Sequence, residues 1–430
     1  MEYHEDPKGA DQKPDVEEKE TYSFMQETIK DQTGGRKKAR NLLMKYIGLG
    51  FVFGLTACLG FYALKPWAEE KFPSNPEKVI IPDEEEEKEP ENTPEDEPDQ
   101  EQSTPVLTIE NYREMNRALY DVAYEVSKSI VEITGTAYDQ SLENGTFDTK
   151  NHVSGVIVFD NGQELLIFGK SSVIRDTDSL TVTFADGKSY NAEVKRKDEN
   201  LGFAVFSVPR SDIQESTWSQ LQIAVLGSSN AVGKGDAAIA VGSPFGYSGG
   251  MGYGIIASAK NVVGKPDGEF GLLTTDIAGT DTGSGVLANL HGEIVGIIDQ
   301  SVSEGDSMKL TTAYGISDLK DIIVCLSNGE TVPYIGVKGV TVSEELASEQ
   351  GMPKGVYVQE VRVDSPAMLA GIQSGDVIVS VDREDVGSLA GYHKLLMAQK
   401  TGDEVKIKGK RQGSGGYVDI DFTVVIGSKE

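Results

Sequence analysis

The chain has 430 residues, with 69 acidic and 40 basic side chains and a formal net charge of −29. This length suits two folded domains with additional segments, since single domains usually contain roughly 100–200 residues. The acidic balance argues against nucleic acid as a partner, because binding to phosphates needs a basic surface. With only Cys58 and Cys325, the chain has no disulfide framework within its folded part.

The first 64 residues read as a tail followed by a membrane anchor. Residues 1–45 are charged, poor in large apolar side chains and end in a basic cluster, which predicts a disordered tail. Residues 46–64 carry no charge and span roughly 28 Å as a helix, enough to cross a membrane. The positive-inside rule then places the N-terminus in the cytoplasm and the rest outside. A lipobox-like alternative would attach a lipid at Cys58.

A charged spacer and then alternating apolar patterns follow. Residues 65–106 are rich in proline and glutamate, and their self-repulsion predicts an extended linker. Thr108 is the predicted N-cap of a helix, and 130–133 is a predicted strand. Short β-patterned runs separated by glycine-containing turns predict a barrel architecture. These runs are 153–159, 165–168, 180–184, 192–194, 203–208, 237–241, 254–257, 272–275 and 294–298.

The segment 274–285, TTDIAGTDTGSG, is typical of the strand and tight turn that present a catalytic serine, here Ser284. A serine hydroxyl needs a neighbouring base, and that base needs a third group to orient it. The chain offers few histidines for this task, and His152 and His291 are interpreted as surface residues. The four histidines are His4, His152, His291 and His393.

Several motifs follow one another between residues 118 and 325: VSKSIV at 126–131, SGVI at 154–157, LGSS at 226–229, VGSPFG at 241–246, GIIA at 254–257 and GEIVGI at 292–297. In order and spacing they resemble the trypsin-like double barrel of the HtrA/DegP family, which implies the fold but not the chemistry. By this resemblance Ser172 stands at the family's histidine position and Gly202 at its aspartate position. Ser284 stands at the nucleophile position, with Thr282 and Gly283 at the oxyanion hole.

Neither Ser172 nor Gly202 can act as a base or an orienting acid. The loss of one member of a triad typically costs on the order of 10⁴- to 10⁶-fold in rate. The sequence therefore favours a pseudoprotease. An active endopeptidase that uses Ser284 with a non-standard base is the alternative, and Lys170, two residues before Ser172, is a candidate for that base. No cofactor is implied, and no metal-ligand spacing stands out.

The pattern changes from residue 331, where SPA at 365–367 and AGIQSGDVI at 370–378 resemble a PDZ domain of the HtrA type. In such domains backbone N–H groups of a loop bind a peptide's C-terminal carboxylate while the peptide adds as a strand. A helix is predicted near 389–399, where Leu395 and Leu396 are groove or core residues and His393 lies on the same helix. By resemblance the carboxylate loop is Tyr334, Ile335, Gly336 and Val337.

The predicted chain is mainly β: a tail at 1–45, a transmembrane helix at 46–64, a linker at 65–106, a double barrel at 107–330 and a PDZ domain at 331–428. The predicted function is that of a membrane-anchored pseudoprotease that binds C-terminal or unfolded peptide segments, as a scaffold or regulator of protein quality control in a bacterial envelope. The alternative is an active HtrA-like endopeptidase that degrades misfolded envelope proteins. The resemblance also implies a homotrimer formed through the segment 112–120.

Overall fold

The structure is a computed structural model that describes residues 44, 56, 77–81, 108–139, 146–303 and 309–430. Residues 73–430 form one compact unit. The predicted tail and membrane helix lie outside the described residues except at Met44 and Thr56, and the alternative at Cys58 lies outside them as well. Within the described ranges no helix combines the length and the apolar character that crossing a membrane requires.

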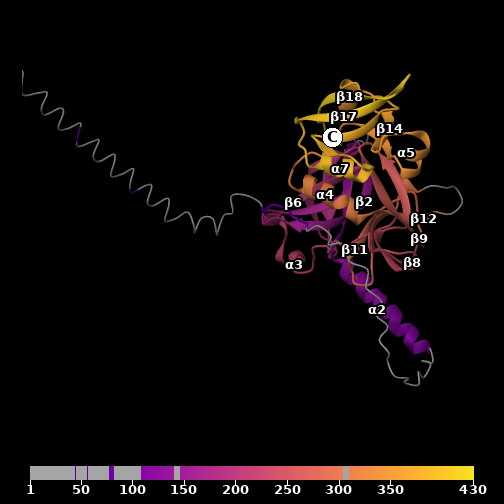
Figure 1. Ribbon diagram of the computed structural model, residues 1–430. Coiled ribbons are helices and arrows are strands. Elements are labelled where there is room, and N and C mark those ends of the chain that lie inside the picture. The colour runs from indigo at the N-terminus through magenta and orange to yellow at the C-terminus, as the bar shows by residue number, and fades with distance from the viewer. Residues whose placement is uncertain (1–43, 45–55, 57–76, 82–107, 140–145, 304–308) are drawn as a thin grey trace, which may run out of the picture. The chain divides into compact units, whose positions relative to one another are not determined.

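Helix α2 (Ile109–Ser127) precedes the barrels and projects away from them (Figure 1). Thr108 is its N-cap, as predicted: the Thr108 hydroxyl accepts the Asn111 N–H at 3.3 Å, and the Asn111 side chain accepts the Thr108 N–H at 3.0 Å. Only Ala123 and Val126 are buried, because the earlier turns extend past the barrel surface. Those turns leave large apolar side chains exposed.

Six antiparallel strands close the first barrel in the order β1-β2-β3-β6-β5-β4. They are β1 (Ile130–Asp139), β2 (Thr146–Asp160), β3 (Glu164–Lys170), β4 (Ser179–Thr183), β5 (Ser189–Asp198) and β6 (Phe203–Pro209). Helix η1 (Ser171–Ile174) connects β3 to β4, and η2 (Arg210–Asp212) and α3 (Glu215–Trp218) follow β6. Side chains alternate along β3, so that Leu165 and Ile167 fill this barrel while Leu166 and Phe168 face the second one.

The second barrel closes in the order β10-β11-β12-β9-β8-β7. Its strands are β7 (Ala237–Ser243), β8 (Gly250–Lys265), β9 (Gly268–Ala278), β10 (Ser284–Ala288), β11 (Ile294–Asp299) and β12 (Leu310–Gly315). Helix η3 (Gln300–Val302) follows β11, and α4 (Ile316–Ser327) follows β12. Except for Phe184, which lies just past β4, the predicted β-patterned runs fall within the observed strands, so the double barrel is confirmed. Helix α4 and strands β10 and β12 were not predicted.

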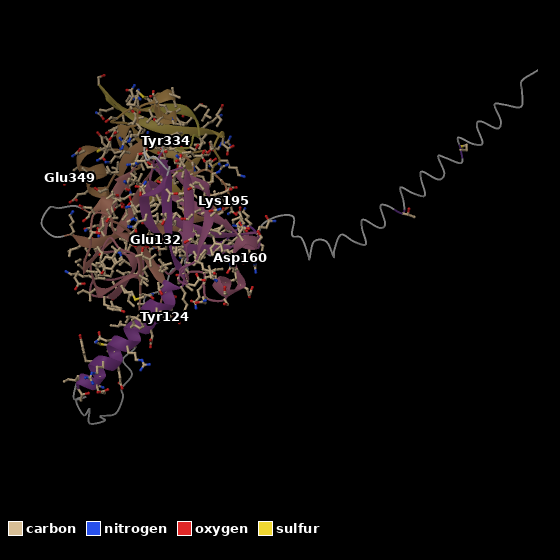
Figure 2. The ribbon with its side chains drawn as sticks, turned by 180° about the vertical axis from the view of Figure 1, so that it is seen from behind. Tyr124, Glu132, Asp160, Lys195, Tyr334 and Glu349 are labelled. Carbon is tan, nitrogen blue, oxygen red and sulfur yellow. The ribbon has the colours of Figure 1, made fainter. Side chains whose placement is uncertain are left out.

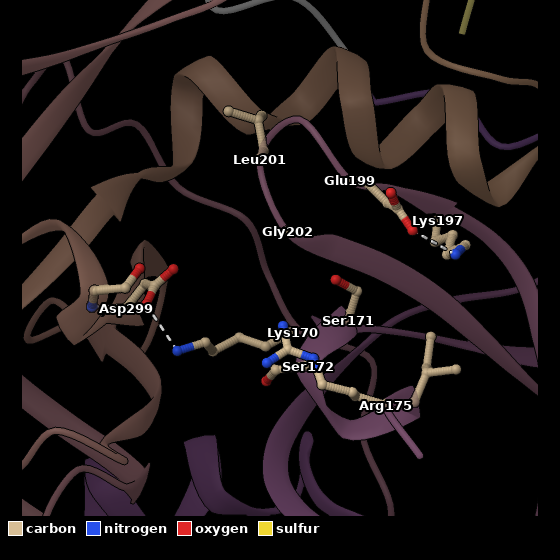
Figure 3. Close-up of a pocket in the computed structure, with 11 residues that line it drawn as sticks. Lys170, Ser171, Ser172, Arg175, Lys197, Glu199, Leu201, Gly202 and Asp299 are labelled. Atoms are coloured by element: carbon tan, nitrogen blue, oxygen red, sulfur yellow. Dashed lines mark hydrogen bonds and ion pairs between the residues drawn. The ribbon is translucent and has the colours of Figure 1, made fainter. Parts of the chain in front are cut away.

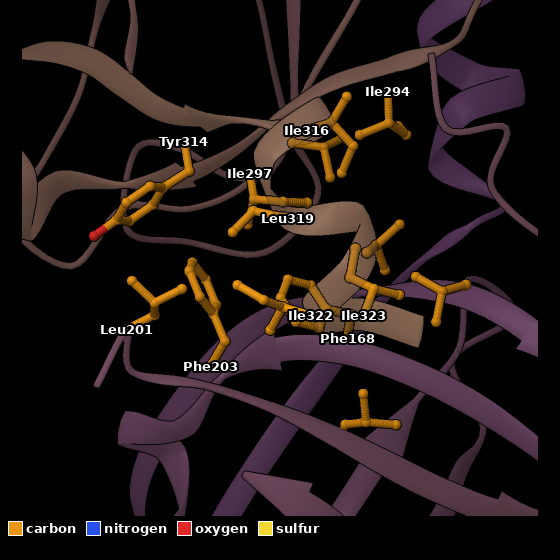
Figure 4. Close-up of a cluster of buried hydrophobic side chains, with 14 of the residues drawn as sticks. Phe168, Leu201, Phe203, Ile294, Ile297, Tyr314, Ile316, Leu319, Ile322 and Ile323 are labelled. Atoms are coloured by element: carbon orange, nitrogen blue, oxygen red, sulfur yellow. The ribbon is translucent and has the colours of Figure 1, made fainter. Parts of the chain in front are cut away.

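One apolar seam joins the two barrels (Figure 4). Phe168 stacks on Phe203 with ring centroids 4.9 Å apart, and Phe203 meets the Tyr314 ring edge-on at 5.5 Å. Phe168 and Phe203 come from the first barrel and Tyr314 from the second. Helix α4 closes the seam with fully buried side chains that include Leu319 and Ile322. The barrels therefore share a core and hold a fixed relation to each other.

A short piece of the predicted linker, residues 77–81, is docked on the barrels. Val79 is buried at 2 % exposure. Its N–H donates to the Asn328 Oδ1 at 3.0 Å, and its carbonyl accepts from the Asn328 Nδ2 at 3.2 Å. The Glu77 N–H also donates to the Asn161 carbonyl at 3.1 Å. The linker predicted as an extended spacer therefore contains one segment that packs against the folded body.

The C-terminal sheet runs in the order β13-β14-β15-β17-β18, with β16 paired to β15. Its strands are β13 (Val337–Thr341), β14 (Val356–Val361), β15 (Val377–Val381), β16 (Glu384–Asp385), β17 (Glu404–Gly413) and β18 (Gly416–Val425). The helices are α5 (Glu344–Gln350), α6 (Pro366–Leu369) and α7 (Leu389–Met397). Leu396 lies in the core of this domain, and Leu395 packs against that core. Tyr334, near its start, lies far from Tyr124 on α2 (Figure 2).

The seam generates a stability prediction. Replacing Phe203 with Ala should lower the free energy of unfolding by about 3–5 kcal/mol, because the change leaves a cavity against Phe168 and Tyr314. Urea unfolding followed by circular dichroism measures this change. Leu290→Ala is the control, because this residue is 50 % exposed and its loss should cost no more than about 0.5 kcal/mol. Equal effects of the two substitutions would contradict the shared core.

Candidate functional site

A pocket of about 560 Å³ opens where the two barrels meet (Figure 3). Ser172 lies on η1, directly after β3, and Gly202 lies directly before β6. The Ser171 N–H donates to the Gly202 carbonyl at 2.8 Å, so the two predicted triad positions do come together. The lining residues are Lys170, Ser171, Ser172, Ile174, Arg175, Lys197, Glu199, Leu201, Gly202, Asp299 and Ser301.

The turn before Gly202 is held by a buried carboxylate that sequence reasoning missed. Asp198 is 2 % exposed and accepts the N–H groups of Asn200 and Leu201, each at 3.1 Å. Burial raises the pKa of Asp198 to about 6, although these hydrogen bonds oppose the rise. Gly202 itself has a φ of +83°, a backbone conformation that glycine adopts easily and other residues do not. The aspartate position therefore has neither an acid nor an ordinary backbone conformation.

Ser284 is the first residue of β10, and its hydroxyl is turned into the protein. The residue is 2 % exposed, and its Oγ accepts the Ser154 N–H at 2.9 Å. The Ser154 Oγ lies 3.0 Å from the Ser243 Oγ. In the part of the chain that the structure describes, no histidine forms a hydrogen bond with Ser284. The hydroxyl of the nucleophile candidate thus contacts the backbone N–H of Ser154 instead of a base.

The predicted oxyanion-hole residues form a tight turn before β10. Thr282 is exposed, and the Gly283 N–H donates to the Thr280 carbonyl at 2.8 Å. A Cβ atom on Gly283 would lie 2.8 Å from the Pro244 carbonyl oxygen, so this turn has no room for a side chain. An oxyanion hole needs N–H groups aimed at the reacting oxygen. The N–H of Gly283 is already used within the turn.

Lys170, the alternative base for Ser284, lines this pocket but is bound to Asp299, and Ser284 is not among the lining residues. The Lys170 Nζ is 2.7 Å from the Asp299 Oδ1, and the two side chains are only 16 % and 5 % exposed. Lys170 ends β3 of the first barrel and Asp299 ends β11 of the second, so this ion pair crosses the seam. An ammonium that donates to a carboxylate has no lone pair with which to accept a proton. Sequence reasoning missed Asp299.

The histidines lie elsewhere. His152 is exposed on β2, and His291 is exposed in the turn after Asn289, whose side chain accepts the His291 N–H at 2.9 Å. His4 lies outside the described residues. The Nδ1 of His393, on α7, is 2.8 Å from the carbonyl oxygen of Asp267. None of the three described histidines lines the pocket that contains Ser172.

The predicted carboxylate loop at 334–337 already holds a carboxylate. Asp267, in the two-residue turn between β8 and β9, accepts the N–H groups of Ile335 at 2.8 Å, Gly336 at 2.7 Å and Val337 at 2.9 Å. The N–H of Tyr334 instead donates to the carbonyl of Gly427. Three of the four predicted loop residues therefore bind a side chain of the second barrel.

Helix α7 completes the surroundings of Asp267. The Tyr392 hydroxyl donates to the Asp267 Oδ1 at 2.8 Å, beside the contact with His393. Neither Asp267 nor Tyr392 was predicted as a site residue. Asp267 occurs in the sequence KPDG, which looks like any exposed hairpin turn, so the sequence carries no local signal of its role.

Two family models match parts of the chain: a trypsin-like peptidase domain at residues 153–297 and a PDZ domain at 333–421. Over 319 residues the chain is 29% identical to "Serine protease Do-like HtrB" of Bacillus subtilis (strain 168), a match that covers 68% of each protein. The chain is an HtrA-like protein. "Serine protease Do-like HtrA" of Lactobacillus helveticus is 28% identical over 309 residues, which cover 66% of the HtrA-like chain and 70% of that relative.

Solved structures have the same fold at lower identity. "HtrA-type protease AlgW with decapeptide" is 19% identical with a TM-score of 0.53. The match covers 73% of the HtrA-like chain and 99% of the AlgW chain. "HtrA-type protease AlgW with tripeptide" is 21% identical with a TM-score of 0.52, over 73% and 97% of the two chains. At this level of identity the similarity establishes the arrangement of barrels and PDZ domain only.

The buried Asp198 predicts a pH dependence of stability. Its pKa is about 6 in the folded chain against 3.8 for an ordinary aspartate, so the folded state takes up the proton more readily. Its contribution to stability is full below pH 3.8 and is lost as the pH rises through 6. Relative to Asp198→Asn, the wild type should lose up to about 3 kcal/mol of unfolding free energy between pH 4 and pH 7. Urea unfolding of both proteins tests this, and parallel pH curves would contradict it.

Proposed function

We propose that this HtrA-like chain is a pseudoprotease that acts through peptide binding by its PDZ domain. The observation that carries the proposal is the state of Ser284. The residue is 2 % exposed and its hydroxyl accepts a backbone N–H from Ser154, whereas a nucleophile needs a base that accepts its proton. The positions that would supply a base and an orienting acid are occupied by Ser172 and by Gly202 at positive φ.

The active-enzyme alternative would need Lys170 as its base. Two features support that alternative: Lys170 lies in the pocket, and its partner Asp299 pairs with Ser284 across the β10–β11 ladder. The ion pair between Lys170 and Asp299 weighs against it, because the lysine would first have to leave its carboxylate partner. Residual proteolysis would therefore require rearrangement of the seam.

The cellular role follows from the predicted membrane helix and from the PDZ domain. A single helix at 46–64 would hold the barrels and the PDZ domain outside the bacterial cell membrane, near newly exported proteins. The solved relatives are named as complexes with a decapeptide and a tripeptide. We therefore assign C-terminal or unfolded segments of envelope proteins as ligands, and a scaffold or regulator of envelope quality control as the role.

A direct test of the pseudoprotease proposal uses an active-site probe. The purified chain should not react with a fluorophosphonate, and its casein digestion should equal that of Ser284→Ala, because no group accepts the serine proton. Labelling is read on a gel and digestion by release of fluorescent fragments. Labelling that disappears in Ser284→Ala would reject the proposal, and labelling that also disappears in Lys170→Ala would establish the lysine-based alternative.

Helix α2 supports the proposed homotrimer. Its projecting turns expose Ile109 at 74 %, Tyr112 at 63 %, Met115 at 53 % and Tyr120 at 53 %, an apolar surface that association would bury. Multi-angle light scattering of the wild type should give a trimeric mass. Tyr112→Asp combined with Tyr120→Asp should shift the chain to monomer, whereas Glu114→Ala on the same helix should leave the trimer intact. A monomeric wild type would reject this assembly.

A further inference from the structure

Asp267 binds the carboxylate loop in the way that the last residue of a peptide ligand would. A C-terminal residue that adds to a PDZ strand places its carboxylate against the loop N–H groups and pairs its backbone with the strand. Asp267 does both. Its carboxylate accepts from three successive N–H groups of the loop, and its own N–H donates to the Val337 carbonyl at 2.6 Å.

The turn that carries Asp267 also fills the space beside the loop. Strand β13 pairs with β14 along one of its edges. At the start of the opposite edge of β13, the carbonyl of Val337 accepts the Asp267 N–H. On the far side, the Phe270 ring meets the His393 ring edge-on at 5.5 Å. A Cβ atom on Gly268 would lie 3.0 Å from the His393 Nδ1. The β8–β9 turn is therefore in close contact with both elements that would border a peptide.

The Asp267 carboxylate is held by neutral donors only. Asp267 is 4 % exposed, and within the described residues no cation forms an ion pair with its carboxylate. Burial raises the pKa of Asp267, whereas the three N–H groups and the Tyr392 hydroxyl act in the opposite direction. Successive backbone N–H groups that converge on an anion form a binding site for a carboxylate. Asp267 thus occupies a ligand site and does not form a salt bridge between domains.

We propose that Asp267 is an internal competitor for the carboxylate loop, so that a peptide with a free α-carboxylate binds only after the β8–β9 turn leaves the loop. This inference rests on the proposed peptide-binding function and concerns its regulation. Because the competitor is part of the same chain, the apparent Kd of a ligand equals its intrinsic Kd divided by the fraction of open molecules. The competitor therefore raises the ligand concentration at which the PDZ domain is half saturated.

The test uses the full chain in detergent and a fluorescent decapeptide that ends in three valines, either as the free acid or amidated. Asp267→Asn removes the charge, and Asp267→Gly removes the side chain. Asparagine and glycine both tolerate the φ of +63° at this position, so the hairpin should fold in both variants. Glu269→Gln is the matched control, because it removes one charge from the exposed side of the same hairpin. Fluorescence anisotropy gives Kd, and hydrogen exchange reports on residues 262–270 and 335–337.

We expect Asp267→Asn to bind the free acid about tenfold more tightly than the wild type, and Asp267→Gly more tightly still, because each raises the open fraction. Glu269→Gln should bind like the wild type, and the amidated peptide should bind poorly to all four proteins. Saturating free acid should speed exchange at 262–268 in the wild type. Equal Kd values in all four proteins, with unchanged exchange in the hairpin, would overturn the proposal.

A failure of the peptide-binding function itself gives a different result. If no protein binds either peptide, the PDZ domain does not recognise this ligand class, and exchange in the unliganded proteins then decides the role of Asp267. Faster exchange at 335–337 in Asp267→Asn and Asp267→Gly than in Glu269→Gln supports Asp267 as the occupant of the loop. Unchanged exchange at those three amides rejects it.

Discussion

The apolar seam between the barrels determines where every polar group of the pocket lies. Each of the strands β3 and β6 is buried on both faces. One face points into the first barrel, and the other packs against the second barrel. A slip of one residue would exchange these faces, so the register of both strands is strongly fixed. Fixed register at the end of β3 places Lys170 and Ser172, and fixed register at the start of β6 places Gly202. The ion pair between Lys170 and Asp299 is a consequence of that arrangement.

Much of the fold could be predicted because its strands carry a period of two and its turns carry glycine. Helix α4 escaped prediction: the run IIVCL at 322–326 reads equally well as a buried strand, and no side-chain cap marks the start of the helix after Gly315. Strand β10 escaped because its first residues were assigned to the serine loop. The docked segment at 77–81 escaped because the three apolar residues Val79 to Ile81, alone in a charged linker, are too few to show a period.

The candidate site was predictable only where a motif fixes a position. Ser172 and Gly202 were placed by their neighbours in sequence, and the structure brings them to one pocket. The contacts that decide their chemistry join distant parts of the chain: Lys170 and Asp299 are 129 residues apart, and Asp267 lies 68 residues before Ile335. Such pairs depend on how one barrel meets the other and how the PDZ sheet meets a hairpin. No local pattern encodes either geometry.

Gly202 also bears on how this scaffold can evolve. An aspartate there would find open space, but a positive φ costs a residue with a Cβ atom roughly 1–2 kcal/mol. A histidine in place of Ser172 would share its pocket with the Lys170 ammonium, which is already paired across the seam. The aspartate would therefore enter a backbone conformation that does not suit it, and the histidine would enter a charge environment that does not suit it. Under the proposed pseudoprotease function, catalysis would return only through several changes made together, and selection would act on stability and binding.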